Sequence, residues 1–389
     1  MNNINIRQGI FRFILGLISS VLIFTLGLLG LEKLVRKIKP QITFSESYGQ
    51  KTGFFEKHNK QAFTIKKNLD IGWLKTNSLG YRGREVTIEK PKDVYRILVL
   101  GDSFVLGVGV GSNDQTFSAV LENELNKTGK KKFEIINAGF HDGFSPDSYY
   151  AYLLEEGLKL APDMVIDCIY LQNDIGDLKG VRWEDLDRFG MPRKVVSEWR
   201  RVDNMGRLYD GIPPLRYKIE PLKESHLWIL IANWLDIHFP ILRSRNEAKK
   251  IKEVQNWYLL IDSDCIFLPD CQTKFDIEFR KLKFVLKNTA KLLEEQKIPL
   301  LFVFEPSKMQ LNIANKSLPR ADITLLADDI IEYLSFETKS NYLDLTMDFL
   351  TPDFIEFYNK IDTHWNKAGN EKAGMLIADK VLKILDLTE

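Results

Sequence analysis

An apolar run of strand length, residues 95–100, ends abruptly in Gly101-Asp102-Ser103. In a parallel sheet, such a strand delivers the residues that follow it to the carboxyl edge, where the next helix begins. A serine at that edge is exposed, and the helix N-terminus can stabilise negative charge that forms beside it. Gly-Asp-Ser is also an ordinary turn and N-cap sequence, so this segment alone indicates a strand end rather than an activity.

Further apolar runs of strand length follow and alternate with helical patterns. We expect strands near residues 133–137, 164–171, 299–304 and 342–346. We expect helices near residues 114–127, 146–160, 277–297, 322–337 and 367–386. This alternation predicts a parallel sheet that is covered by helices on both faces. Side chains at the carboxyl ends of the strands would then lie together at one edge.

An Asp-x-His pattern stands directly before the last helical segment. His364 can act as general base to a serine, and Asp362 can fix its tautomer and stabilise the imidazolium that forms. The alternative is that Asp362 is a loop residue that caps the helix beginning near Asn366, with His364 as a bystander.

Two candidate donors for an oxyanion lie between these ends of the chain. The expected second strand runs into a loop that contains Gly143, and the third strand ends at Asn173. A loop amide and the Asn173 side-chain amide could stabilise a tetrahedral intermediate. The alternative is ordinary loop chemistry, since Gly, Asn and Asp are common turn residues. Four such signals in one order, each at an expected strand end, together favour a hydrolase.

In this order the four segments resemble the SGNH hydrolases, the superfamily of GDSL esterases, whose marker residues are Ser, Gly, Asn and His. Ser103 stands in the Gly-Asp-Ser block, Asn173 in the Asn-Asp block and His364 in the C-terminal Asp–His block. The resemblance covers residues 95–387, with a long insertion. Residues 77–84 resemble a lead-in of membrane-anchored bacterial members, and the Asp-Thr-His-Trp form of the last block is similar to alginate-type polysaccharide O-acetylation proteins.

The resemblance implies an α/β fold: a flavodoxin-like three-layer sandwich with a parallel sheet, an N-terminal transmembrane helix and a helical insertion. It implies catalytic roles for Ser103, Asp362 and His364, and an oxyanion hole that draws on Asn173, Gly143 and Asp142.

The sequence departs from the family pattern at three places. Phe104 replaces the Leu of GDSL, a variation that leaves the nucleophile's chemistry intact. Asp142 occupies the family's oxyanion-glycine position, where a carboxylate is unfavourable unless it points away; Gly143 is the other candidate donor. Asp362 lies two residues before His364, whereas many members use three; the shorter spacing matches the acetylation subgroup.

Residues 13–31 carry no charge and are long enough to span a bilayer as one helix. A cleaved signal peptide and a buried core helix are the alternatives. We expect a retained anchor, because the run is longer than a usual signal peptide's and no A-x-A-like cleavage site is evident.

The orientation of this helix is ambiguous from charge. Basic residues stand on both sides, and more of them follow the helix than precede it, so a positive-inside count favours a cytoplasmic C-terminal region. The N-terminal tail is short, related anchored esterases are extracytoplasmic, and large domains cross largely regardless of charge. We therefore expect the catalytic domain to be periplasmic.

The composition adds few constraints. A net charge of +1, from 54 basic and 53 acidic residues, gives no electrostatic case for nucleic acid. The five histidines show no metal-ligand spacing, and no cofactor is implied. Cys168 is expected in the core, whereas Cys265 and Cys271 fit a disulfide or two free thiols about equally well.

We divide the chain into an anchor with its basic flank (1–40), a lead-in segment (41–94) and a hydrolase-like domain (95–389), with a Trp-rich insertion at 179–275. The insertion could grip substrate, face the membrane or simply enlarge the core. It carries five of the seven tryptophans: Trp183, Trp199, Trp228, Trp234 and Trp257. Arg82, Arg84 and Glu305 are interpreted as surface or domain-packing residues, and contact with substrate is the alternative.

The expected function is that of a membrane-anchored serine esterase or O-acyltransferase. Its substrate would be an acylated glycan or small ester, with O-acetyl groups of a cell-surface polysaccharide or cell-wall glycan favoured. It would contact the lipid bilayer through residues 13–31, and the sequence does not indicate which proteins it binds. Two other functions stay open: a lipid-directed esterase or lysophospholipase, and a non-catalytic glycan-binding or assembly protein that retains the fold.

Overall fold

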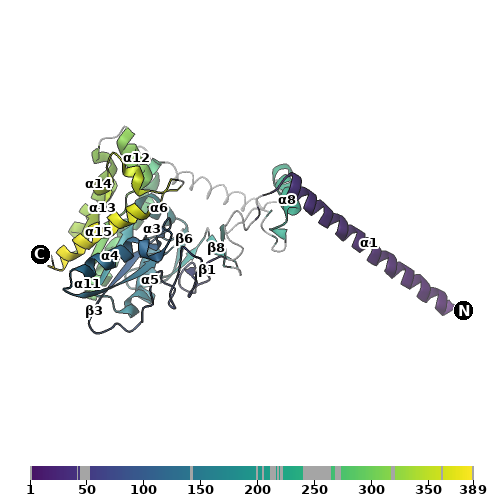
Figure 1. Cartoon of the computed structure of the whole chain (residues 1–389), viewed down its shortest axis with the longest axis horizontal. Helices are drawn as coiled ribbons and strands as arrows, with labels where there is room; N and C mark the ends of the chain where they lie inside the picture. Colours follow the sequence, from purple (N-terminus) through teal and green to yellow (C-terminus); the bar gives the residue numbers. More distant parts are fainter. Residues whose placement is uncertain are drawn as a thin grey trace. The chain divides into compact units, whose positions relative to one another are not determined.

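A computed structural model describes the elements of the chain (Figure 1). The described residues are 2–41, 43, 53–140, 143–198, 200–203, 206–210, 216, 219, 222–239, 264–267, 273–316, 320–360 and 362–387. They fall into two compact units. One comprises Met1–Gly53 and Arg207–Ile251, and the other comprises Phe54–Gly206 and Lys252–Glu389.

The larger unit is built on a five-stranded parallel sheet with the order β11-β10-β5-β3-β4. In chain order this is 2-1-3-4-5, the flavodoxin-like arrangement, whose topological switch point lies between the strands β3 and β5. The strands are β3 (Val94–Gly101), β4 (Lys132–Gly139), β5 (Met164–Ile169), β10 (Leu300–Phe304) and β11 (Asn341–Asp344). The predicted α/β fold and its parallel sheet are confirmed.

Helices cover both faces of the sheet because the strands are apolar on both sides. In β3, Ile97 and Val99 face one layer while Leu98 and Leu100 face the other, and all four are fully buried. The first layer holds α4 (Phe117–Lys127) beside α15 (Lys367–Ile384), and Figure 1 shows the two in contact in blue and yellow. The second layer holds α5 (Pro146–Glu155), α11 (Asp276–Glu295) and α13 (Arg320–Glu337).

The helix ends follow local rules of capping and periodicity. The Thr116 side chain accepts a hydrogen bond from the Ala119 N–H and caps α4, whose inward residues Phe117, Leu121 and Leu125 recur every four positions. The Asn366 side chain caps α15, so Asp362 does not serve as that helix's cap.

Short elements complete the larger unit. They are β1 (Phe55–Glu56), β2 (Thr64–Ile65), α3 (Ser103–Leu106), α6 (Leu171–Asp177), β6 (Val181–Leu186), β7 (Pro192–Ser197), β8 (Arg200–Val202), α12 (Lys308–Lys316) and α14 (Thr346–Phe349). The strands β6 and β7 pair as an antiparallel hairpin at the start of the predicted insertion. The resemblance implied a helical insertion, and this hairpin was not predicted, because its charged and half-buried residues do not form an apolar strand run.

The smaller unit contains α1 (Asn2–Ile38), β9 (Leu208–Asp210) and α8 (His226–His238). Figure 1 draws α1 as one uninterrupted helix. Its apolar stretch is long enough to cross a membrane, and none of that stretch is buried, which excludes a core helix. The helix α8 lies within the Trp-rich insertion and agrees with the helical insertion that the family resemblance implied.

Candidate active site

The turn that follows β3 holds Ser103 at the carboxyl edge of the sheet. A Cβ atom at Gly101 would lie 2.3 Å from the Val105 side chain, so only glycine lets the chain turn this tightly. The Asp102 side chain accepts a hydrogen bond from the Phe104 N–H at 2.8 Å and caps α3, which begins at Ser103. Because α3 is a single turn of 4 residues, local N–H groups rather than a long helix dipole would act on a charge here.

His364 reaches Ser103 from a loop near the C-terminus. The His364 Nε2 atom lies 2.8 Å from the Ser103 Oγ atom, across 261 positions of sequence. Tyr358 and Trp365 form an antiparallel bridge at the base of this loop, and Trp365 is buried against Phe349. The loop therefore has a rigid base from which the imidazole extends to the serine.

Asp362 lies beside His364 but is not hydrogen-bonded to its ring. The Asp362 Oδ1 atom is 3.5 Å from the His364 Nδ1 atom and accepts a hydrogen bond from the His364 backbone N–H at 2.9 Å. The ring Nδ1 has no hydrogen-bond partner within the described part of the chain. The aspartate thus shapes the loop and approaches the imidazole within ion-pair distance.

Asn173 is held beside the Ser103 turn by Asp102, the residue that precedes the serine. Asn173 lies on α6 after β5, and its Nδ2 atom donates a hydrogen bond to the Asp102 Oδ2 atom at 3.0 Å. An amide nitrogen carries two hydrogens, so one stays available for an oxyanion. The strands β3 and β5 flank the topological switch point, which is where ligands bind in sheets of this kind.

The strand β4 leads to Gly143 at the same edge of the sheet. A Cβ atom at Gly139 would lie 2.1 Å from the Leu106 backbone nitrogen, so this glycine lets β4 pass against α3. Gly143 follows in a turn with a φ of +86°. Asp142, the other predicted oxyanion residue, lies outside the described residues.

Two residues that support the site were not predicted to do so. Arg82 is buried, and its Nη1 atom donates to the carbonyl oxygens of Leu106 at 2.8 Å and Gly107 at 2.7 Å, at the end of α3. The Lys308 Nζ atom donates to the carbonyl oxygens of Asn359 at 2.6 Å and Asp362 at 3.2 Å, within the histidine loop. Nothing local in the sequence marks these contacts, because each joins segments far apart in the chain.

Buried carboxyls lie beneath the site. Burial and the charge of Asp102 raise the pKa of Asp174 well above its usual value, although the Tyr149 hydroxyl and the Tyr170 N–H donate hydrogen bonds to it. Burial and the charge of Asp102 also raise the pKa of Glu305 well above its usual value, although a contact with the Cys168 thiol opposes this shift. Glu305 is therefore a packing residue that favours its neutral form.

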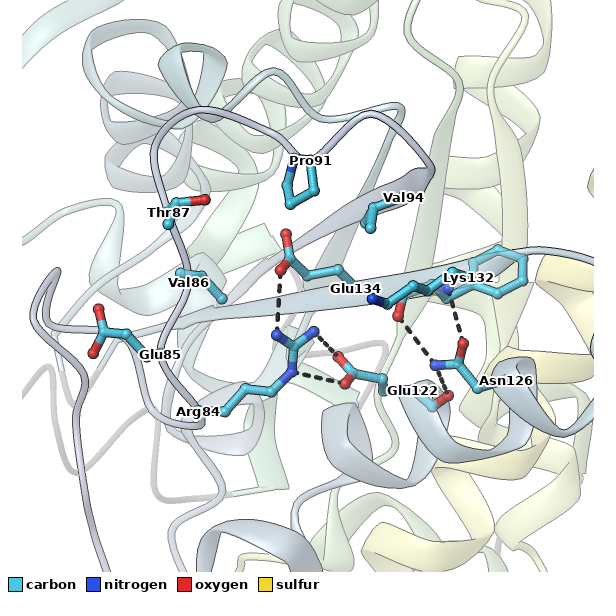
Figure 2. Close-up of a pocket in the computed structure, with 11 residues that line it drawn as sticks. Arg84, Glu85, Val86, Thr87, Pro91, Val94, Glu122, Asn126, Lys132 and Glu134 are labelled. Carbon is cyan, nitrogen blue, oxygen red and sulfur yellow. Dashed lines mark hydrogen bonds and ion pairs between the residues drawn. The ribbon is translucent and has the colours of Figure 1, made fainter.

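A cavity of about 480 Å³ lies at the opposite edge of the sheet (Figure 2). It is lined by Val94 and Lys132, the first residues of β3 and β4, and Figure 2 shows Arg84 bound to Glu122 and Glu134 beside it. Since β3 has 8 residues, this cavity is about 25 Å from the serine edge at about 3.3 Å per residue. It is not part of the candidate active site.

The described residues include no group of three or more His, Cys, Asp or Glu side chains that could hold a metal ion. Cys168 is a buried free cysteine, as predicted for a core position. Cys271 lies outside the described residues, so the structure does not bear on its pairing with Cys265.

No family model matches the chain, and no curated protein is similar to it in sequence. Solved structures are similar at low identity. A lipase/acylhydrolase from Enterococcus faecalis is 13% identical with a TM-score of 0.39, and the match covers 74% of this chain and 96% of that one. A GDSL-like lipase from Bacteroides thetaiotaomicron is 9% identical with a TM-score of 0.38, and the match covers 77% and 93%.

The acetyl xylan esterase AlAXEase is also similar, at 15% identity and a TM-score of 0.38, with coverage of 75% of this chain and 99% of that one. The solved structures to which the chain is similar thus include a GDSL-like lipase and an acetyl xylan esterase. The finer resemblance to alginate-type O-acetylation proteins is not shown by these comparisons.

Proposed function

We propose that the larger unit is a serine esterase of the SGNH type, with Ser103 as nucleophile and His364 as general base. The observation that carries this proposal is the 2.8 Å separation of the Ser103 Oγ and His364 Nε2 atoms, at the switch point of the sheet. A serine bound to a histidine in this way can lose its proton as it attacks a carbonyl carbon.

The mechanism proceeds through an acyl-enzyme. Ser103 Oγ attacks the ester carbonyl while His364 takes its proton, and Asp362 stabilises the imidazolium. The oxyanion receives hydrogen bonds from Asn173 Nδ2 and from the N–H groups of Ser103 and Gly143. His364 then protonates the departing alcohol. Water, or a sugar hydroxyl in a transferase reaction, attacks the acyl group and frees the serine.

The substrate we propose is an O-acetyl ester of a cell-surface polysaccharide or cell-wall glycan. The sequence block Asp362-Thr363-His364-Trp365 and an anchor that would hold the enzyme at a membrane favour this class. We also propose that the catalytic unit is periplasmic, where such glycans are accessible.

We propose that α1 is retained as an anchor rather than cleaved. Two hydroxyls within its apolar run are satisfied inside the helix: those of Ser20 and Thr25 donate to the carbonyls of Gly16 and Val21, each at 2.8 Å. Such bonding suits a helix in lipid, where no water pairs polar groups. Glu32 also accepts hydrogen bonds from the start of α8, and cleavage on the C-terminal side of Glu32 would remove them.

Hydrolysis of 4-nitrophenyl acetate by the full chain in detergent tests the reaction. We expect turnover by the wild type that disappears in Ser103→Ala, and release of acetate from an acetylated polysaccharide with the same dependence. Equal rates for the two proteins on both substrates, with Ser103→Ala folded, would contradict the esterase and favour a binding protein.

A further inference from the structure

The helix α8 carries apolar side chains on its outward face. Ile231 and Trp234 are 42% and 51% exposed, whereas Ile229 and Ala232 on the inward face are buried. Phe239, which follows the helix, is 45% exposed and its ring contacts that of Trp234. A helix at a water-facing surface normally turns polar residues outward. This face is therefore built to contact something apolar.

The start of α8 is fixed to the end of the apolar run of α1. Glu32 is the first residue after that run, and its carboxylate accepts hydrogen bonds from the Ser225 hydroxyl at 2.8 Å, the His226 N–H at 3.0 Å and the Leu227 N–H at 2.8 Å. The Gln41 N–H donates to the His226 ring at 2.9 Å. If α1 spans a bilayer, these contacts hold the first turn of α8 at the level of the lipid headgroups.

Length and charge favour a position along the bilayer surface. The 13 residues of α8 are too few to span the hydrocarbon core, which needs about 20. A basic cluster follows Glu32 at the end of α1 and just after it, and such clusters are attracted to anionic headgroups. Tryptophan is enriched at this boundary because its ring is apolar and its N–H is polar. The cluster comprises Lys33, Arg36, Lys37 and Lys39.

We propose that the outward face of α8, with Ile231 and Trp234 at its centre, lies in the headgroup–acyl boundary of the bilayer that α1 spans. This inference rests on the proposed role of α1 as an anchor. The chain passes between the two units at residues 53/54, 206/207 and 251/252. Three chain connections, rather than one, then join the catalytic unit to a membrane-bound unit.

Quenching of tryptophan fluorescence by brominated lipid tests this contact. The full chain is reconstituted in vesicles of phosphatidylcholine and phosphatidylglycerol, with phosphatidylcholine brominated near the headgroup end of its acyl chain. The helix α1 contains no tryptophan, so quenching reports other segments. We expect Trp234→Phe to lose most of the quenching, whereas Trp73→Phe, a change in the catalytic unit, leaves it unchanged.

A second variant guards against a local folding defect. Ile231→Trp in the Trp234→Phe background is expected to restore quenching, because residue 231 lies on the same face one turn away. Flotation of the vesicles with the protein tests the anchor separately. Protein that floats but shows equal quenching in wild type and Trp234→Phe would overturn the α8 contact and leave the anchor standing. Protein that does not float would overturn both.

Discussion

At the scale of single residues, we expect the side chains of His364 and Asp362 to affect the rate of ester hydrolysis to different degrees. His364 contacts Ser103 directly, whereas the Asp362 carboxylate lies 3.5 Å from the imidazole without a hydrogen bond to it. We predict that His364→Ala lowers kcat/KM for 4-nitrophenyl acetate by about 10²–10⁴-fold. Asp362→Asn should cost less than His364→Ala, because the Asp362 carboxylate makes no hydrogen bond to the ring and the aspartate is the least costly residue to remove from a Ser-His-Asp set. A larger loss for Asp362→Asn than for His364→Ala would contradict these roles.

Asn173 is the residue whose side chain we expect to stabilise the oxyanion. Its amide is oriented by Asp102, so one hydrogen is used and the other is free. Asn173→Ala is predicted to lower kcat by about 10²-fold with little change in KM, since the lost interaction forms in the transition state. Steady-state kinetics check this split. A rise in KM with kcat unchanged would assign Asn173 to substrate binding instead.

At the scale of elements, Arg82 supports the turn that presents Ser103. Its guanidinium donates to the Leu106, Gly107 and Trp73 carbonyls, and burial lowers its pKa to about 10, so it stays charged at neutral pH. Arg82→Ala leaves buried carbonyls unpaired and is predicted to cost about 2–4 kcal/mol of unfolding free energy.

Arg84 provides the matched control for that prediction. It is half exposed and pairs with Glu122 and Glu134, and Arg96 also holds Glu134. Arg84→Ala is therefore expected to cost less than about 1 kcal/mol. Denaturation of the two variants and the wild type in the same detergent gives the loss of unfolding free energy for each substitution. Equal losses of unfolding free energy in the two variants would contradict a stabilising role for the contacts of Arg82 with α3.

The same elements show what the sequence reveals and what it conceals. The five sheet strands and the helices beside them lie within a few residues of their predicted ranges, because apolar runs and helical periodicity mark buried elements. The cap that Asp102 provides is a local pattern, but its contact with Asn173 and the contacts of Arg82 and Lys308 could not be predicted. Their contacts join the chain ends of separate elements, and no periodicity encodes which side chain meets which carbonyl.

At the scale of the whole molecule, a buried carboxyl couples stability to pH. Asp167 on β5 is fully buried, its oxygens have no partner among the described residues, and burial raises its pKa well above 3.8. Between pH 3.8 and that raised pKa, the folded state keeps a proton that the unfolded state releases. Raising the pH through this window therefore lowers the free energy of unfolding.

Asp167→Asn removes this titration. We predict that the variant's melting temperature, relative to wild type, rises as the pH increases from about 5 to about 8. For Asp353→Asn, which replaces an exposed carboxyl, the melting temperature relative to wild type should change less over the same pH range. A relative stability of Asp167→Asn that falls with pH would contradict the burial argument.

The arrangement of the chain in two units follows from contacts that the sequence does not display. Residues 207–251 belong with α1 through bonds such as that of Glu32 to Ser225, which are 193 positions apart in the sequence. The motif blocks predicted which residues meet at the sheet edge, because parallel strands share one carboxyl edge. No motif in the sequence marks residues 207–251 as a segment that packs with α1.

The most direct test of the central claim is to treat the full chain with a fluorophosphonate and locate the adduct by mass spectrometry. Attack of the Ser103 Oγ atom on phosphorus would form an O–P bond and release fluoride, and His364 would accept the proton. We predict one phosphonyl adduct on Ser103, absent in Ser103→Ala and formed much more slowly in His364→Ala. No adduct in the folded wild type, or one on a different residue, would contradict the assignment of Ser103 as the nucleophile.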